Sequence, residues 1–155
     1  MSLETVVLAV DGTQTNADAD LAKAAADIAG PAEATVVLAR IHTKDEYETI
    51  RGLLNADPDS EVTPETVAAR RTDVRELADT LTEADLDLDV QVRSRLSDGD
   101  TDQSERLVDI AEETDADLLL VGGHDRTPIG KAVFGSTAQE VMLDAPCPVT
   151  FVRAA

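Results

Sequence analysis

Two glycine-containing segments in the C-terminal part of the chain carry residue types that suit phosphate binding. Gly122 follows the apolar run LLLV, and a glycine there lets the backbone turn and approach a ligand closely. Gly135-Ser136-Thr137 precedes an apolar-periodic run, and Thr137 with Glu140 has the spacing of a capping box, which marks a helix start. A helix start offers unbonded N–H groups, hydroxyls and the positive end of the helix dipole. The two segments therefore predict a phosphate site.

Two buried strands are expected to position this site. Residues 5–10 (TVVLAV) and 117–121 (DLLLV) are short apolar runs bounded by turn signals, which is typical of parallel strands covered on both faces. Asp11 directly follows the first run, and ligands of open α/β sheets bind at the carboxyl ends of strands. Asp11 is therefore a candidate ligand-binding residue, with a turn or cap residue as the alternative.

The rest of the chain alternates helical and strand patterns, with Gly30-Pro31 expected to end the first helix. The expected helices are 16–29, a short one over 45–54, 63–84, one from about 101, and 137–144 with Val141 and Met142 facing the core; the other expected strands are 35–41, 86–95 and 149–152. The strand over 86–95 alternates apolar and polar residues, so it is predicted at a sheet edge. His42 is expected at the surface. Five strands alternating with four principal helices predict one doubly wound α/β domain, residues 1–155, with a parallel sheet.

Composition narrows the location and the partners. The formal net charge of −19 disfavours nucleic acid and anionic membrane as partners. No apolar run is long enough for a membrane span and no signal-peptide pattern occurs, so a cytoplasmic location is expected. The acid-rich, lysine-poor surface indicates a halophilic protein from a cell with high internal salt. The single Cys147 excludes an internal disulfide and a cysteine metal cluster, and is expected to be a small buried residue.

Three pieces of the chain resemble the universal stress protein family: VVLAVDGT near the N-terminus, ADLLLVGGH, and FGSTAQEVMLDAPCPVTFVR at the end. Nucleotide-binding members have a pattern of Gly, two residues, Gly, nine residues, Gly, then Ser or Thr. Gly122 and Gly135-Ser136 fit its outer positions, whereas Asp125 stands where the second glycine is expected. The resemblance implies a Rossmann-like sheet of order 3-2-1-4-5. The first and fourth strands would then be neighbours, with Asp11 and Gly122 on either side of a crevice.

The resemblance also implies roles for the site residues. Asp11 would hold the ribose or adenine side, and Ile41 would contact adenine through its backbone. The residues expected around ribose and phosphates are Gly122, His124, Gly135, Ser136 and Thr137. Asp125 would repel phosphate, and a Mg²⁺ ion bridging it to phosphate oxygens is one way to offset that repulsion. Neither a catalytic residue nor a set of protein metal ligands is predicted.

Two functions follow from this reading. The first is an ATP-binding regulatory module of the stress response, with hydrolysis at most slow and incidental, because the sequence offers no evident base or nucleophile. The alternative, which Asp125 favours, is a nucleotide-free dimeric interaction protein of the same fold. A homodimer through the strand 149–152 is expected in both cases. That strand is short and apolar at a predicted sheet edge, which needs cover, and the family resemblance implies pairing there.

Overall fold

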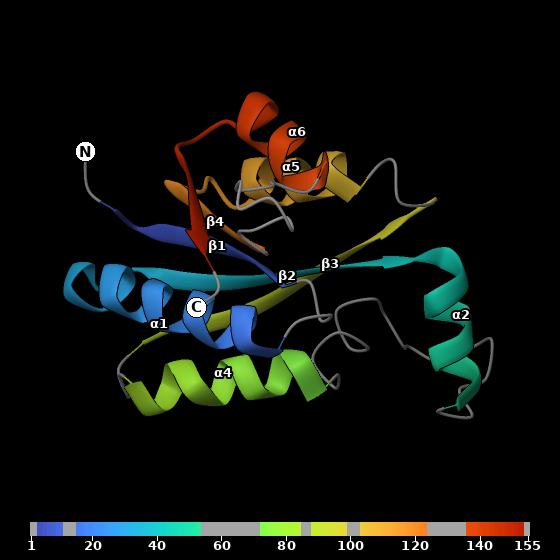
Figure 1. The fold of residues 1–155 in the computed structure, drawn as a ribbon, viewed down its shortest axis with the longest axis horizontal. Coiled ribbons are helices and arrows are strands. Elements are labelled where there is room, and N and C mark those ends of the chain that lie inside the picture. The colour runs from blue at the N-terminus through green and yellow to red at the C-terminus, as the bar shows by residue number, and fades with distance from the viewer. Residues whose placement is uncertain are drawn as a thin grey trace, which may run out of the picture.

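The chain folds into a five-stranded parallel sheet of order β3-β2-β1-β4-β5, with helices against both faces (Figure 1). A computed structural model describes residues 3–10, 15–53, 72–84, 88–98, 103–123 and 136–153. The strands are β1 (Thr5–Val10), β2 (Thr35–Thr43), β3 (Val90–Ser97), β4 (Leu118–Gly123) and β5 (Val149–Arg153). The described helices are α1 (Thr15–Ala32), α2 (Lys44–Leu53), α4 (Thr72–Ala84), α5 (Gln103–Glu113) and α6 (Ser136–Asp144).

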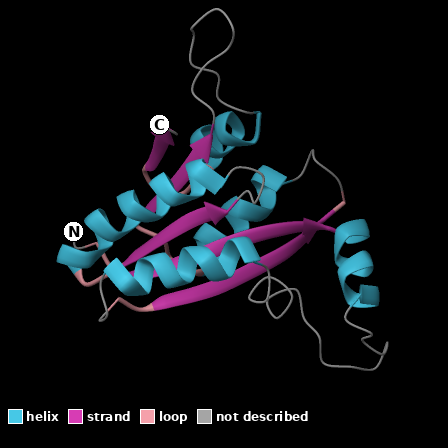
Figure 2. Ribbon diagram, turned by 60° about the horizontal axis from the view of Figure 1, so that its bottom comes forward, coloured by secondary structure: helices cyan, strands magenta, loops and turns pink. Residues whose placement is uncertain are grey.

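Alternation along the strands divides the apolar side chains between two cores. Figure 1 shows α1 and α4 on one face of the sheet and α5 and α6 on the other. Figure 2 shows α1 and α4 side by side in front of the strands. The first core, under α1 and α4, contains Val6, Leu8, Leu38, Leu81 and Leu120 among others. The second core, under α5 and α6, contains Val7, Val37, Ile110, Leu119 and Val141 among others. Burial on both faces confirms that β1, β2 and β4 are interior strands.

The expected strand order is confirmed, and β3 and β5 lie at the two edges. β3 begins and ends later than the expected 86–95, but most of its side chains are only partly buried, as predicted for an edge, and Ser94 and Ser97 are the buried exceptions. The short helix expected over 45–54 is α2. The expected start of the helix over 63–84 lies outside the described residues, whereas its later part is α4. No helix in the described ranges is both long and apolar enough to cross a membrane.

The first helix does not stop at Gly30-Pro31, as the sequence predicted, but continues to Ala32. A Schellman motif closes it instead: the Glu33 N–H donates to the Gly30 carbonyl at 3.1 Å. The Ala34 N–H donates to the Ala29 carbonyl at 3.0 Å, and Glu33 takes the left-handed conformation with φ 55°. Neither bond needs an N–H from Pro31, so a proline is tolerated in this last turn.

The glycine pair after the fourth strand is also placed differently from the prediction. Gly122 and Gly123 belong to β4, and they pair with Val152 and Arg153 of β5 instead of turning the chain away. The helix α6 begins at Ser136, one residue before the expected cap, and it buries Val141 as predicted. Met142 was expected to face the core, but its side chain is 38% exposed. Met142 directly follows the buried Val141, and neighbouring residues of a helix point about 100° apart, so Met142 lies off the buried face.

Candidate functional site

The strand register brings three backbone positions level at the carboxyl edge of the sheet. Val10, the last residue of β1, pairs with Arg40 of β2. On the other side Leu8 pairs with Leu120, so continuing that parallel register sets Gly122 level with Val10. Adjacent strands lie about 4.8 Å apart, so β2 and β4 are separated by about 10 Å across the end of β1. The prediction that the first and fourth strands are neighbours is confirmed, and their register brings Gly122 level with the carboxyl end of β1.

Ile41 reaches this edge through its backbone and not through its side chain. The side chain is 6% exposed and packs in the second core. The Thr35 N–H donates to the Glu4 carbonyl, and alternation along β2 then turns the N–H and carbonyl of Ile41 toward β1 as well. β1 ends at Val10, so the Ile41 carbonyl lies just past the end of that strand. This placement fits the expected backbone role of Ile41.

Arg40 is a residue at this edge that sequence reasoning missed. Its guanidinium Nη1 donates to the Ile41 carbonyl at 2.9 Å, which holds the cation near the end of β1. Its own carbonyl accepts a 2.6 Å hydrogen bond from the hydroxyl of Ser94, a residue of β3 that is 1% exposed. The signal was a single basic residue inside the otherwise apolar run TVVLARI. In a chain of net charge −19, such a cation is a notable local charge.

The start of α6 lies toward the same edge of the sheet. The C-terminal end of α6, Asp144, is joined by the short segment 145–148 to the amino end of β5. A helix that packs on the sheet and returns to a strand start runs opposite to the strands. Ser136 and Thr137, at the other end of α6, therefore lie toward the carboxyl edge. Four other predicted site residues, Asp11, His124, Asp125 and Gly135, lie outside the described residues.

His42 was expected at the surface, and that prediction is wrong. Its side chain is fully buried, because β2 continues past Ile41 and α2 begins directly afterwards. The imidazole Nδ1 lies 3.9 Å from a carboxylate oxygen of Glu46 in the first turn of α2. Thr43 accepts a hydrogen bond from the Glu46 N–H at 3.1 Å and so caps α2. The spacing of Thr43 and Glu46, typical of a capping box, was the signal that could have predicted this start.

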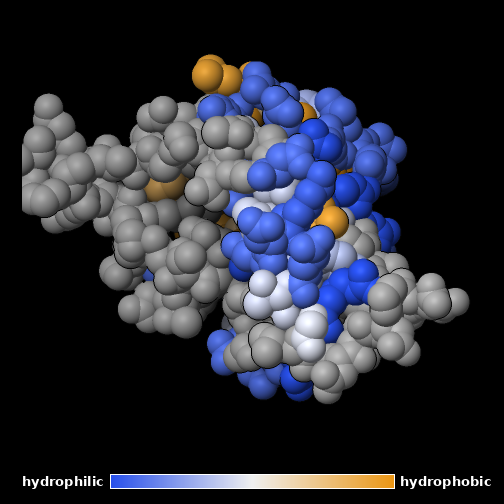
Figure 3. Space-filling model, turned by 90° about the vertical axis from the view of Figure 1, so that its right-hand side faces the viewer, coloured by the Kyte–Doolittle hydropathy of each residue, from blue (hydrophilic) through white to orange (hydrophobic). Residues whose placement is uncertain are grey.

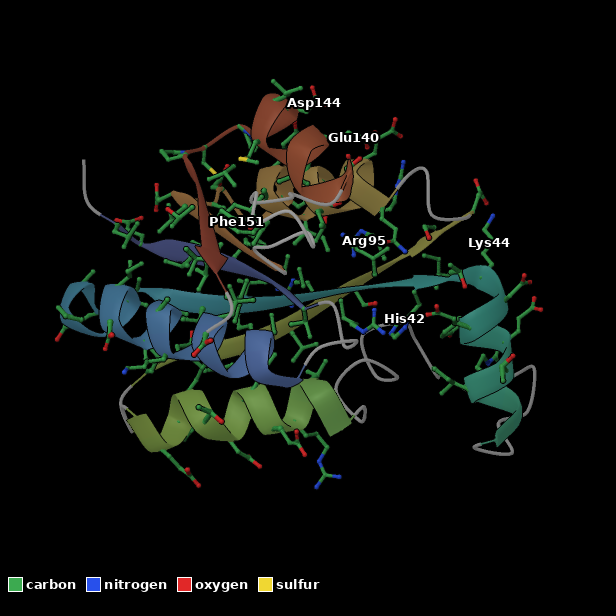
Figure 4. The ribbon with its side chains drawn as sticks, viewed as in Figure 1. His42, Lys44, Arg95, Glu140, Asp144 and Phe151 are labelled. Carbon is green, nitrogen blue, oxygen red and sulfur yellow. The ribbon has the colours of Figure 1, made fainter. Side chains whose placement is uncertain are left out.

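An ion pair also joins α2 to the end of β3. Lys44 Nζ lies 2.6 Å from Asp98 Oδ1, and both side chains are well exposed. Figure 4 shows Lys44 and His42 near the junction of β2 and α2, beyond the main body of the sheet. Figure 3 views the molecule from this side, and the described residues there are predominantly hydrophilic. Among the residues that the structure describes, those beside α2 and the end of β3 therefore form a polar surface next to this end of the sheet.

The single cysteine of the sequence, Cys147, lies at the amino ends of the strands, on the side of the sheet opposite the proposed site. Burial raises the pKa of the Cys147 thiol, and the negative charge of Asp117 raises that pKa further. Asp117 itself accepts hydrogen bonds from the backbone N–H groups of Glu4 (2.8 Å) and Thr5 (3.1 Å). A thiol whose pKa is raised is a poor nucleophile at neutral pH. Cys147 is partly rather than fully buried, and it packs beside the second core.

The order of the sheet and the layers of helices define a doubly wound Rossmann-like fold. The model of the universal stress protein family matches residues 2–153, and the chain belongs to that family. A universal stress protein of Thermus aquaticus, named from the QAH/OAS sulfhydrylase 3' region, is 31% identical over 150 residues, covering 97% of this chain and 98% of that one. A match to one of Mycolicibacterium smegmatis, 40% identical over 52 residues, covers 34% of this chain and 40% of that relative.

Solved structures of universal stress proteins share the fold along the whole chain. One, in complex with cAMP, has a TM-score of 0.67 and 22% identity and is covered, like this chain, over 100% of its length. Another, from Archaeoglobus fulgidus in complex with dAMP, has a TM-score of 0.65 and 18% identity, covering 99% of this chain and 100% of that one. At these identities the likeness establishes the fold.

Proposed function

We propose that this universal stress protein is a regulatory module that binds an adenine nucleotide, ATP with Mg²⁺, at the carboxyl edge of β1 and β4. The observation that carries the proposal is the register that sets Gly122 level with Val10 and Arg40. That edge is where doubly wound sheets bind ligands. The neighbours solved with cAMP and dAMP support an adenine nucleotide as the ligand class.

In this proposal the ligand spans the end of β1. The Ile41 backbone faces the adenine, Gly122 allows close approach, and Ser136 and Thr137 offer backbone N–H groups and hydroxyls to the phosphates at the start of α6. Asp11, His124 and Gly135 complete the site. The Arg40 guanidinium, held by the Ile41 carbonyl, adds positive charge near the nucleotide. Because the chain has a net charge of −19, this cation offsets part of the repulsion of a polyphosphate.

A nucleotide-free interaction protein is the second candidate, and Asp125 is the observation that favours it. A carboxylate within the glycine pattern opposes phosphate approach unless a divalent cation lies between them. Neither candidate requires turnover, and we propose that any ATP hydrolysis is slow and incidental. We propose a halophilic character from the acid-rich, lysine-poor composition, and a cytoplasmic location from the absence of a long apolar run in the sequence.

Calorimetric titration with ATP and Mg²⁺ in molar potassium chloride tests the proposal on the wild type, Asp125→Gly and Ser136→Ala. We expect saturable binding to the wild type that weakens in Ser136→Ala. Binding only to Asp125→Gly would mean that one carboxylate has abolished the site. Absence of binding to all three proteins would favour the interaction protein. Parallel titrations with AMP and cAMP identify the preferred phosphate.

We also propose a homodimer paired through β5. The Leu119 N–H donates to the Pro148 carbonyl, so alternation along β5 turns the backbone groups of Thr150 toward β4. The backbone groups of Val149 and Arg153 are turned the other way, toward the sheet edge. Arg153→Pro should therefore abolish the dimer without breaking the β4–β5 ladder, whereas Thr150→Pro should destabilise the fold itself. Light scattering and thermal unfolding of both variants separate these effects, and a dimeric Arg153→Pro would place the interface elsewhere.

A further inference from the structure

Ser104 and Glu140 connect α5 to α6 by a hydrogen bond between side chains. The Ser104 hydroxyl donates to Glu140 Oε2, although the two residues lie far apart in the sequence. Ser104 is 4% exposed, so its hydroxyl has been taken from water and depends on a protein partner. A hydrogen bond to a carboxylate is stronger than one between neutral groups. The contact therefore restrains α6 relative to α5, and Figure 4 shows Glu140 on α6 near α5.

Few other described side chains restrain α6. Val141 is fully buried in the second core, but Met142 is 38% exposed and Leu143 is 84% exposed. One buried apolar side chain does not by itself fix the rotation of a helix or its position along its axis. The polar contact made by the neighbouring residue, Glu140, supplies that directional restraint.

Ser104, the other residue of this hydrogen bond, belongs to a helix that packs tightly on the sheet. Leu107, Ile110 and Ala111 of α5 are buried, so the helix is fixed on the sheet by several side chains. Ser104 is in the first turn of α5, where the helix dipole favours a negative charge. The carboxylate of Glu140 is thus directed toward the start of α5. The sheet therefore fixes α5, and the hydrogen bond from Ser104 to Glu140 fixes α6 relative to α5.

We propose that Ser104 and Glu140 are positioning residues that hold the start of α6 where it binds the phosphates of the nucleotide. Glu140 is one helical turn from Ser136, the first residue of α6. A rotation or shift of α6 moves the N–H groups of its first turn away from the phosphates. The inference rests on the proposed nucleotide function, and it identifies a contact outside the site that sets phosphate affinity.

The test compares ATP with adenosine, because adenosine lacks the phosphates that α6 would bind. Calorimetric titrations with each ligand, with Mg²⁺ in molar potassium chloride, use the wild type, Ser104→Ala, Glu140→Ala and the double variant. We expect each single variant to bind ATP about tenfold more weakly, the order of one charge-assisted hydrogen bond. The double variant should be no weaker than either one. Adenosine affinity should stay unchanged in all of them.

Conservative variants and one control separate positioning from loss of stability. Ser104→Thr and Glu140→Gln keep a donor and an acceptor, so both should retain most of the ATP affinity. Thr114→Val removes a hydroxyl whose hydrogen bonds stay within its own chain segment, to the Ile110 and Ala111 carbonyls, and this variant should bind both ligands normally. Equal losses for ATP and adenosine, or additive losses in the double variant, would overturn the inference. If the wild type binds ATP and the variants bind it equally well, this inference is wrong but the proposed function stands. If the wild type does not bind ATP, the proposed function and this inference are both wrong.

Discussion

Asp117 connects the beginning of β4 to the beginning of β1, at the amino ends of the strands and therefore opposite the proposed nucleotide site. One oxygen, Oδ2, accepts hydrogen bonds from the N–H groups of Glu4 at 2.8 Å and Thr5 at 3.1 Å. The Asp117 N–H donates to the Thr5 carbonyl at 2.8 Å, and that backbone bond does not depend on the side chain. Replacing the carboxylate therefore removes two bonds from the start of β1 and leaves the strand register in place.

The expected loss for Asp117→Ala is about 2 kcal/mol of unfolding free energy. A hydrogen bond to a charged group contributes about 1.5–3 kcal/mol when it is lost without replacement. The Glu4 N–H is exposed and can turn to water, so most of the loss comes from the part-buried Thr5 N–H. Asp117→Asn keeps an acceptor oxygen, and we expect it to lose about half as much. For a chain of this size, 2 kcal/mol corresponds to about 4–8 °C in melting temperature.

Urea unfolding followed by circular dichroism, in molar potassium chloride, measures these differences. Glu112→Ala is the matched control, because it also removes one carboxylate, from an exposed position on α5. It should unfold within about 0.5 kcal/mol of the wild type, as surface substitutions usually do. If Asp117→Ala unfolds at the same midpoint as Glu112→Ala, the two hydrogen bonds do not stabilise β1 and the reasoning is wrong.

Further outcomes are expected for two residues that follow helix ends, for Cys147 and for the salt dependence of stability. Glu33→Gly should raise the unfolding free energy, measured in urea, by about 1 kcal/mol, because Glu33 has φ 55° and places a negative charge at a helix C-terminus. Asp115→Gly, at φ 52°, should raise the unfolding free energy by less, since Asp tolerates this conformation better. Iodoacetamide should alkylate Cys147 slowly near pH 8, and faster in Asp117→Asn, because both burial and Asp117 raise the pKa of the thiol; a rate equal to that of a free thiol would contradict this. The folded state then retains the thiol proton to higher pH, so this group's contribution to stability falls as pH rises through the raised pKa. Raising potassium chloride from 0.1 M to 1 M shortens the screening length from about 10 Å to about 3 Å. Because this weakens the repulsion among the negative charges of the protein, the urea midpoint should rise. An unchanged midpoint would count against the proposed halophilic character.

Local patterns in the sequence were enough to predict most of the elements. The runs TVVLAV and TVVLARI predicted β1 and β2, and Leu107 with Ile110 predicted the buried face of α5. Such patterns are reliable because side chains repeat every two residues in a strand and every 3.6 residues in a helix. The alternating residues of β3 likewise predicted an edge strand. The strand order came from the family resemblance and not from these periodicities.

Element ends were predicted less well, since competing local signals are resolved by neighbouring segments. Pro31 predicted a helix stop, yet hydrogen bonds made by Glu33 and Ala34 close α1 after it. Gly122 and Gly123 predicted a turn, yet pairing with β5 keeps both in the sheet. A glycine permits a turn without requiring one, and only the partner strand decides between the two outcomes.

The sequence by itself determined the α/β class, the buried faces and the glycine and hydroxyl residues of the proposed site. Tertiary structure decided which residues meet: Arg40 lies beside the Ile41 carbonyl, His42 is enclosed at the start of α2, and Ser104 bonds to Glu140. The physical reason is that periodicity reports how each segment meets water or the core. Contacts between segments depend on strand register and helix packing, which arise only when the whole sheet is assembled.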